Sequence, residues 1–239
     1  MDLSIIIPAF NEGRKIAYDI KSAADFLLRE HLVGEIIVVD DGSTDDTAER
    51  ARSAMIDPSI EKRILRHDRN HGKGFAVKMG MAVARGEFVM FSDSGSCTPL
   101  SYARRAMDLI RSGQCEIAHG SRKLPDSVIL KRQKLGRRIA SKLFRAAMGI
   151  VMGIPGEMTD TQCGFKVYRG DIGRELYGEC RTMDFMFDIE IILRALRKGY
   201  RVHEFPIQWT SDHDSRVLPV RTSWRVIGEM ISIKQSMKL

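Results

Sequence analysis

The sequence has few cysteines and no long apolar run, and both shortages limit what this protein can be. Its 239 residues include four cysteines, which are widely spaced and form no C-x-x-C pair. This spacing argues against a disulfide framework and against a zinc site. No segment approaches the run of about 18 apolar residues that a membrane-spanning helix needs. Because the first residues lead directly into a strand-like segment, we expect no signal peptide and a cytoplasmic protein.

Internal repeats and low-complexity linkers are also lacking. Charged residues make up 29% and hydrophobic residues 44% of the chain, which is typical of a soluble globular protein. The length suits one domain with a substantial core. We therefore expect a single domain over residues 1–239.

The net charge of +7 is concentrated in one part of the chain. Residues 122–145 contain nine Lys or Arg and one acid, Asp126, so this segment carries +8 and the rest of the chain about −1. Only 7% of the residues are aromatic, and Phe144 is the one aromatic residue in this segment, so it lacks the regular interleaving of aromatic and basic residues that nucleic-acid-binding surfaces usually show. The charge therefore indicates one basic patch and disfavours a nucleic-acid partner.

Strand-like and helix-like segments alternate along the chain. The run at residues 88–91 is apolar throughout, and those at 4–7 and 35–39 are apolar after Ser4 and Glu35, which is typical of strands buried on both faces of a parallel sheet. Segments at 16–29, 74–84 and 100–111 have helical character. We predict an α/β fold with a Rossmann-like, mostly parallel sheet and helices on both faces. Further strands are expected at 63–66, 116–120, 164–168 and 201–209, and further helices at 130–152, 187–197 and 221–238.

The segment 87–99 is predicted to form the central strand and the loop that follows it. Asp93 comes at the carboxyl end of this strand, where ligands bind in open α/β sheets. Its carboxylate could hold a metal, a ribose hydroxyl or an acceptor, or could only tie down its own loop. Thr98 and Pro99 are expected to be the N-cap and the first turn of the next helix.

Several motifs together resemble a known family. The segments at 6–12 (I-I-P-A-F-N-E), 38–43 (V-V-D-D-G-S) and 70–74 (N-H-G-K-G) are similar to the nucleotide-sugar half of family 2 glycosyltransferases, which have the GT-A fold. The chain also resembles the dolichyl- and polyprenyl-phosphate hexosyltransferases at 120–122 (G-S-R), 137–138 (R-R), 160–166 (D-T-Q-C-G-F-K) and 187–190 (F-D-I-E). The last two motifs look most like the dolichyl-phosphate glucosyltransferase branch. The resemblance covers residues 3–216 and implies a nucleotide-sugar half at 1–99, an acceptor half at 100–216 and a C-terminal amphipathic helix at 217–239.

One position departs from the family pattern. The family's central strand usually ends in D-x-D, whose second Asp is a metal ligand, but this chain has Gly95 there. The resemblance implies Mg²⁺ or Mn²⁺, with Asp93 as the remaining metal ligand. One carboxylate can suffice because Mg²⁺ often takes its other ligands from substrate phosphates and water.

The resemblance also implies which residues bind the donor. Pro8, Ala9 and Glu12 would line the nucleoside pocket, and Asp41 would accept from the uracil or the ribose. One of the pair Asp40 and Asp41 is expected to cap its own loop. Lys73 either approaches a phosphate or is a turn lysine in water. The complete donor-side set is Pro8, Ala9, Glu12, Asp40, Asp41, Lys73, Asp93 and Ser94.

A polyprenyl-phosphate acceptor is already an anion, so its attack needs no general base but does need cations to position it. Arg122, with Arg137 or Arg138, falls at the family's phosphate-binding positions. Asp93, Arg122 and Arg138 are assigned catalytic roles. The alternative for Arg122 is a solvated surface side chain. Weaker candidates for the diphosphates or for the acceptor loop are Lys166, Asp188, Glu190 and Arg216, of which Asp188 and Glu190 could equally cap a helix start.

The predicted basic helix at 130–152 is interpreted as a membrane-surface element. It could also be a solvated face packed on the core. Each basic residue near anionic lipid contributes about 1 kcal/mol, so several could hold the protein at a bilayer without a spanning helix. We therefore expect peripheral attachment to the cytoplasmic face of a membrane.

The favoured function is inverting transfer of a hexose, with glucose from UDP-glucose preferred, to a polyprenyl or dolichyl phosphate. One alternative is transfer to a soluble or saccharide acceptor, which would require a carboxylate base near position 95. Another is a non-catalytic nucleotide-sugar-binding protein. A sugar nucleotidyltransferase is disfavoured because the first loop reads P-A-F-N-E and is not rich in glycine and arginine.

Overall fold

The structure, a computed structural model, describes residues 1–95, 97–131, 149, 151–184, 186–210 and 219–237. Its centre is a seven-stranded sheet in the order β3-β2-β1-β4-β7-β5-β8. The neighbours among β1 to β4 pair in parallel, as do β5 and β8, whereas β7 runs antiparallel to β4 and to β5. The predicted mostly parallel sheet is confirmed, and β7 is the exception to it. The strands are β1 (Leu3–Ala9), β2 (Gly34–Asp40), β3 (Glu61–Arg66), β4 (Phe88–Ser92), β5 (Ile117–Ser121), β7 (Phe165–Arg169) and β8 (Val202–Pro206).

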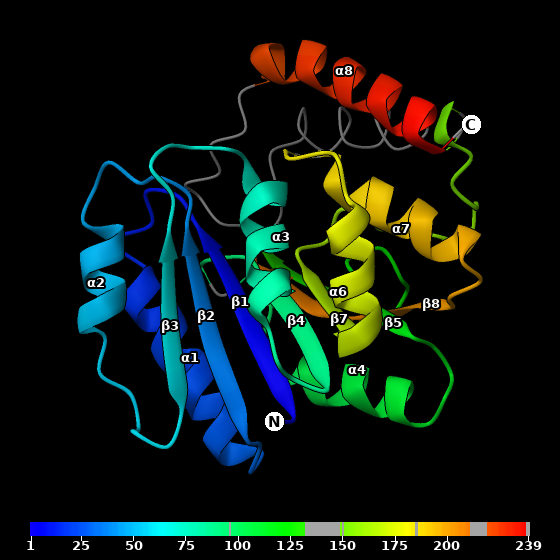
Figure 1. The fold of residues 1–239 in the computed structure, drawn as a ribbon. Helices are drawn as coiled ribbons and strands as arrows, with labels where there is room; N and C mark the ends of the chain where they lie inside the picture. Colours follow the sequence, from blue (N-terminus) through cyan, green and yellow to red (C-terminus); the bar gives the residue numbers. More distant parts are fainter. Residues whose placement is uncertain (96, 132–148, 150, 185, 211–218, 238–239) are drawn as a thin grey trace.

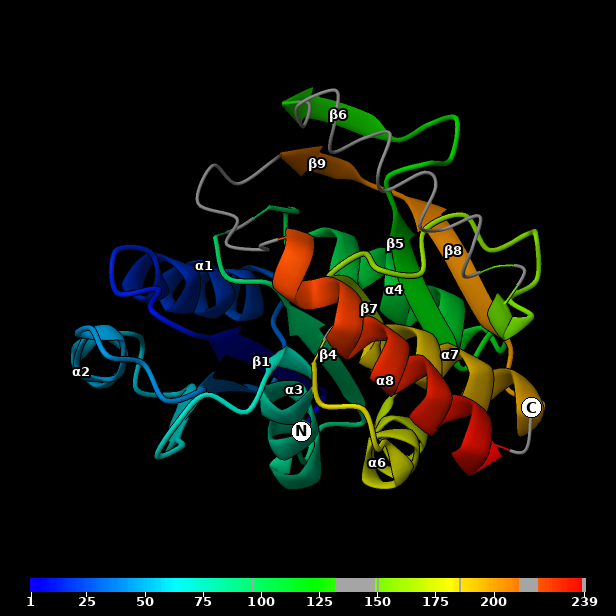
Figure 2. The same cartoon turned by 90° about the horizontal axis from the view of Figure 1, so that it is seen from above.

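Helices cover both faces of this sheet (Figures 1 and 2). One face packs against α1 (Ile16–Arg29), α2 (Thr47–Ser53) and α4 (Tyr102–Arg111). The other packs against α3 (Lys73–Val83), α6 (Gly170–Glu179) and α7 (Phe187–Arg197). The helix α8 (Pro219–Met237) lies beyond the edge at which β1 to β4 end (Figure 1). It therefore lies on the side of the molecule where a ligand of this sheet would bind.

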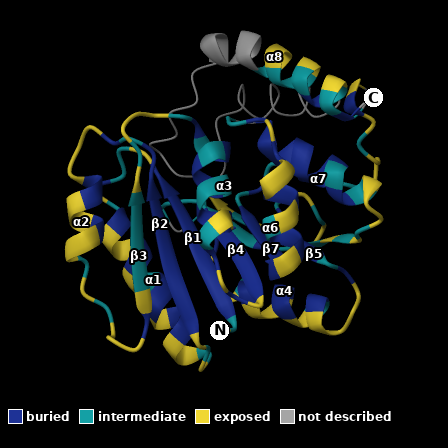
Figure 3. Cartoon of the chain, in the orientation of Figure 1, coloured by how far each residue is buried: buried dark blue, intermediate teal, exposed yellow. Residues whose placement is uncertain are grey.

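The apolar runs of the sequence form the buried middle of the sheet. Every residue of β1, β2 and β4 is buried, whereas the edge strand β3 is only partly covered (Figure 3). Burying one such Ile, Val or Phe side chain stabilises the fold by about 1.5–3 kcal/mol, so these three strands anchor the loops that follow them.

A small second sheet contradicts one predicted element. β6 (Val128–Lys131) and β9 (Gln208–Thr210) pair in parallel. Leu130 and Lys131 are therefore in a strand, and the prediction that a basic helix begins at residue 130 is wrong at its start. Most of the remainder of that predicted helix, residues 132–148 and 150, lies outside the described residues.

Three further boundaries differ from the prediction. The strand expected at 201–209 is two strands, because the chain leaves β8 at Pro206, which has no N–H to donate, and enters β9 at Gln208. The helix expected from Thr98 begins at Tyr102, and the backbone from Pro99 to Arg104 makes i to i+3 hydrogen bonds of a tight turn instead. No prediction covered α6, which contains three glycines and packs closely on β7 through Gly173. No helix of the described residues is both long and apolar enough to cross a bilayer.

Candidate active site

The loops after β1, β2 and β4 meet at the point where the strand order changes direction. β1 lies between β2 and β4, so the chain moves to one side of the sheet after β1 and to the other before β4. Crevices at such switch points are the usual ligand sites of open α/β sheets. The predicted donor residues all lie in or next to these loops.

Side chains join the loops after β1 and β2. Asn11, which has a positive φ of 54°, donates its backbone N–H to the Ser43 hydroxyl at 2.8 Å. Its side-chain oxygen accepts from the backbone N–H groups of Thr44 at 2.8 Å and Asp45 at 3.3 Å. The two loops therefore form one rigid unit at the edge of the sheet.

The predicted nucleoside residues lie on this unit. Pro8 and Ala9 are buried at the end of β1, and Ala9 accepts the backbone N–H of Asp41 at 2.9 Å. Glu12 follows in the loop, where its carboxylate pairs with Lys15 at 3.4 Å. Their contact with a nucleoside remains a prediction.

Both acids at the end of β2 hold loops. Asp41 is 3% exposed and accepts from the backbone N–H groups of His71 at 3.1 Å and Gly72 at 2.8 Å, and it contacts the His67 ring at 2.9 Å. Asp40 accepts the backbone N–H three residues further on at 3.0 Å. Loop capping was expected of one member of the pair, and the structure assigns it to both. Asp41 thereby fixes the turn that leads into α3 and Lys73.

Lys73 lies against the central Asp93. Its ammonium is 2.5 Å from the Asp93 carboxylate and lies over the rings of Phe91 at 5.5 Å and Phe187 at 5.8 Å. Burial lowers the pKa of Lys73, but Asp93 and Asp188 outweigh burial and raise it above its ordinary value. Lys73 is therefore a charged lysine in the site, and the alternative of a turn lysine in water does not describe it.

A second ion pair lies behind the first. Lys166 is fully buried, forms a salt bridge with Asp188 and donates to the carbonyl of Thr161 at 2.8 Å. Burial raises the pKa of Asp188 in spite of Lys166 and Lys73, which lower it. Lys73 and Lys166 thus alternate with Asp93 and Asp188, so that each charge has an opposite neighbour, as buried charges require.

Glu190, the second acid of the F-D-I-E motif, orders a loop. It is fully buried and accepts from the backbone N–H groups of Arg181 at 3.0 Å and Thr182 at 2.8 Å. Arg194 also contacts it, through Nε at 2.8 Å. The loop-ordering role considered for Glu190 therefore agrees with its contacts.

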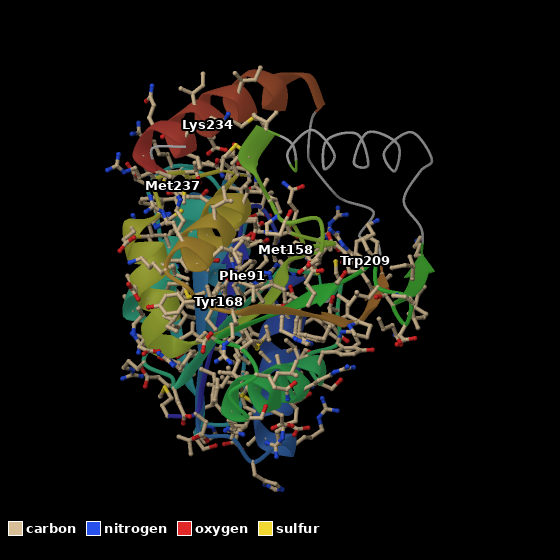
Figure 4. All side chains as sticks on the ribbon, turned by 90° about the vertical axis from the view of Figure 1, so that its right-hand side faces the viewer. Phe91, Met158, Tyr168, Trp209, Lys234 and Met237 are labelled. Atoms are coloured by element: carbon tan, nitrogen blue, oxygen red, sulfur yellow. The ribbon has the colours of Figure 1, made fainter. Side chains whose placement is uncertain are left out.

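Arg122 is held by a carboxylate that is not among the predicted site residues, that of Asp160. Its Nε and one terminal nitrogen donate to the two oxygens of Asp160 at 2.6 and 2.7 Å, and its guanidinium lies 5.2 Å from the ring of Trp209. Figure 4 labels this tryptophan. Burial lowers the pKa of Arg122, but Asp160 outweighs it and raises that pKa further above its ordinary value. Because a guanidinium has five N–H donors, an edge remains with which Arg122 could contact a phosphate.

Glu204 of β8 supports this pair. Its carboxylate accepts from the backbone N–H groups of Thr159 at 2.7 Å and Asp160 at 2.8 Å. Asp160 could have been found from the sequence, because it is the first residue of the D-T-Q-C-G-F-K motif. Glu204 had no such signal, because it contacts residues 44 and 45 positions away in the sequence.

The loop after Asp93 is held by another residue that the sequence did not indicate, Asp19 of α1. Asp19 is 5% exposed, and its carboxylate accepts from the Ser94 hydroxyl at 2.7 Å and the Gly95 N–H at 2.9 Å. Gly95 has a φ of +97°, a backbone conformation that residues with a side chain rarely adopt. The turn at Gly95 is therefore built for glycine, and Ser94 is engaged with α1.

Three of the predicted phosphate-binding arginines belong to segments 132–148 and 211–218. Arg137, Arg138 and Arg216 lie outside the described residues. Their roles remain predictions from the resemblance.

A divalent metal would have one protein carboxylate here. The described residues contain no cluster of three or more His, Cys, Asp or Glu side chains that could enclose a metal. The Asp93 side chain is 39% exposed, so it fits a metal that takes its other ligands from a diphosphate and water. Lys73 would then share Asp93 with the metal.

With this geometry in hand, comparison with known proteins gives the family. The family model for glycosyl transferase family 2 matches residues 4–174. The chain belongs to glycosyltransferase family 2. The family and the GT-A fold expected from the sequence motifs are thereby confirmed.

Curated relatives in this family cover nearly the whole chain. The chain is 30% identical over 244 residues to dolichyl-phosphate beta-glucosyltransferase of Dictyostelium discoideum, which covers 97% of this chain and 73% of that protein. It is 28% identical to the protein of the same name from Saccharomyces cerevisiae, covering 98% and 74%. It is also 30% identical to glycosyltransferase AglD of Haloferax volcanii, but it spans only 35% of that protein's length.

Among solved structures, glucosyl-3-phosphoglycerate synthase from Mycobacterium tuberculosis, crystallised with Mn²⁺ and UDP-glucose, has the same fold. The TM-score is 0.72 at 20% identity, over 97% of this chain and 78% of that one. At this identity the likeness shows the fold alone.

Proposed function

We propose that this family 2 glycosyltransferase transfers glucose from UDP-glucose, with inversion, to a polyprenyl or dolichyl phosphate. The names of the relatives that match over most of their length support this acceptor, and they match the branch that the D-T-Q-C-G-F-K and F-D-I-E motifs resemble.

The observation that carries the proposal is that the carboxylates around the site already accept hydrogen bonds or form ion pairs within the protein. Asp19, Asp40 and Asp41 accept hydrogen bonds, while Asp93 and Asp160 are paired with a lysine and an arginine. A sugar hydroxyl needs a carboxylate to take its proton, whereas a phosphate acceptor is already ionised. A site with its acids so occupied favours an anionic acceptor.

Positive charge for the departing diphosphate would come from Lys73. It is charged, lies at the carboxyl end of the central strand and is held in place by Asp93. Preorganised charge of this kind lowers the barrier because nothing must reorient as the leaving group becomes more negative. A Mg²⁺ or Mn²⁺ ion held by Asp93 would add Lewis-acid stabilisation of the same diphosphate.

The acceptor phosphate would contact Arg122, whose guanidinium is already oriented by Asp160. Because Asp160 neutralises its charge, Arg122 would attract the phosphate only weakly. It would instead orient the phosphate through hydrogen bonds from its remaining N–H groups. An acceptor of this kind lies in a membrane, so we also propose peripheral attachment. The exposed Ile227 and Ile231 on α8, which are 46% and 51% exposed, and the basic segment 122–145 support it.

The direct test is transfer of radiolabelled glucose from UDP-glucose to a short-chain polyprenyl phosphate, measured by extraction into an organic phase. We expect label in the organic phase, at least about tenfold less of it with EDTA, and recovery on adding Mg²⁺ or Mn²⁺. Full transfer in EDTA would overturn the metal role of Asp93. Nucleotide binding without transfer from any UDP- or GDP-sugar would support the non-catalytic alternative.

A further inference from the structure

A carboxylate on the inner face of α8 joins this helix to the start of α7. Glu229 accepts hydrogen bonds from the backbone N–H groups of Met183 at 3.2 Å, Asp184 at 2.9 Å and Met186 at 3.1 Å. Met186 is the N-cap residue of α7, and a carboxylate is favourable at this end of a helix. Glu229 therefore fixes Met183, Asp184 and Met186, the entry segment of α7, to α8.

On its other side, the entry segment contacts the first turn of α3. The backbone N–H of Phe75 donates to the carbonyl of Met183 at 3.0 Å. A Cβ at Gly72 would lie 2.4 Å from that same oxygen, and a Cβ at Gly74 would lie 2.8 Å from the Cβ of Phe187. Glycine alone permits such an approach, so the two backbones are in direct contact.

Lys73 lies between these two glycines. Its backbone position is therefore set by the contact of Gly72 and Gly74 with the entry segment, and its ammonium by Asp93 and the Phe187 ring. A chain of contacts thus runs from α8 through Glu229 and Met183 to the lysine of the site.

Apolar packing seats α8 independently of Glu229. Ile233 and Met237 of α8 are buried with Ile189 and Leu193 of α7, and Met230 packs against them. Figure 4 labels Met237 on α8. Replacing Glu229 should therefore release the entry segment without detaching the helix.

We propose that Glu229 is a positioning residue: it holds the entry segment so that Lys73 meets the departing diphosphate. This role rests on the proposed function in one respect only, namely that the group contacted by Lys73 is the departing diphosphate. The positioning itself can be measured without turnover.

The first experiment is amide hydrogen exchange by NMR on the full chain. In Glu229→Ala we expect the Phe75 amide, which has no contact with Glu229, to exchange about tenfold faster or more, because its acceptor Met183 is no longer fixed. The matched control is Gln235→Ala, an exposed position on the same helix, which should leave Phe75 unchanged. Faster exchange at Met183 and Asp184 with no change at Phe75 would overturn the proposal.

The second experiment is a double-mutant cycle in the transfer assay. Glu229→Ala should lower kcat about tenfold when Lys73 is present and less than about twofold in Lys73→Met, since both changes remove one function. Equal losses in both backgrounds would overturn the proposal, because a structural defect would act whichever residue is at position 73. If the unaltered protein transferred no sugar, the proposed function alone would fail, and the exchange result would still decide the role of Glu229.

Discussion

Lys73 is a partly buried positive charge, with its side chain 28% exposed, and two acids, Asp93 and Asp188, keep it ionised. Its ammonium is also covered by the rings of Phe91 and Phe187, which favour a cation on their faces. Such a group costs free energy to bury unless it is paired, so its retention at the end of the central strand indicates a role beyond stability.

Replacing Lys73 tests this role. Lys73→Met should lower kcat by about 100-fold or more, since it removes the preorganised charge facing the leaving group. The matched control is Lys21→Met, an exposed lysine on α1, which should leave kcat unchanged. Steady-state transfer assays measure both, with circular dichroism to confirm folding. An active Lys73→Met protein would show that charge neutralisation comes from elsewhere.

Gly95 illustrates how backbone conformation limits a site. Restoring the family's second acid by Gly95→Asp would place a side chain at a φ of +97°. We expect this change to destabilise the protein by about 1–2 kcal/mol. For a chain of this length, each kcal/mol lost lowers Tm by about 2–4 °C. Thermal unfolding measures this loss of stability. Gly113→Ala serves as the comparison, because Gly113 also has a positive φ but has open space around the added Cβ. A Gly95→Asp protein with higher Tm than the parent would contradict the turn described here.

At the scale of elements, the segment before β7 is held to β5 and β8 by the Arg122–Asp160 pair and by Glu204. Asp160→Asn leaves Arg122 without its partner and should lower the free energy of unfolding at pH 7 by about 3 kcal/mol. The matched control is Asp171→Asn, in the exposed pair with Arg169, which should cost below about 1 kcal/mol.

The same variant gives a pH dependence with a defined sign. Burial raises the pKa of Asp160, but Arg122 outweighs it and lowers that pKa below its ordinary value. The pair therefore stabilises fully above the unfolded-state pKa of about 4, and its contribution is lost as the pH falls through the folded-state pKa. Denaturant unfolding at a series of pH values should show that the difference in free energy of unfolding between the parent and Asp160→Asn becomes smaller below about pH 4. A difference that stays constant to pH 3 would contradict the pairing.

Elements with strong periodicity were predictable, and those with weak or competing signals were not. The apolar runs at β1, β2 and β4 gave these strands and the position of Asp93. The glycines of α6 hid that helix, which tertiary packing of Gly173 and Leu176 stabilises instead. β6 was missed because its short Val128–Lys131 run continues into residues with helical spacing.

The contacts within the site show the same division. Motif positions such as Lys73 and Arg122 could be named from the sequence, but their partners could not. Asp19 and Glu229 contact loops 75 and about 45 residues away, and no local pattern indicates a contact across that distance. Sequence periodicity reports the faces of elements, whereas these bonds depend on how the elements pack.

At the scale of the whole molecule, the helix α8 lies on the side of the sheet where the site lies (Figure 1). Its residues Ile227 and Ile231, one turn apart, are exposed to solvent. We expect the protein to sediment with anionic vesicles at low salt and to be released as salt screens the basic segment. Changing both isoleucines to Ser should lower the vesicle-binding constant about 30-fold, because about 1 kcal/mol of apolar burial is lost at each. Met55→Ser, at a 92% exposed apolar position outside α8, is the control. Equal sedimentation of all three proteins would contradict membrane seating through α8.

Acceptor choice is the most direct test of the proposed function. The protein would be incubated with labelled UDP-glucose and equal concentrations of a short polyprenyl phosphate and 3-phosphoglycerate, and the label in the organic and aqueous phases counted. The engaged acids of the site predict a preference of about tenfold or more for the polyprenyl phosphate, since its attack needs no base. Label found mainly in glucosyl-3-phosphoglycerate in the aqueous phase would contradict the proposed acceptor and would show that the site uses a soluble acceptor.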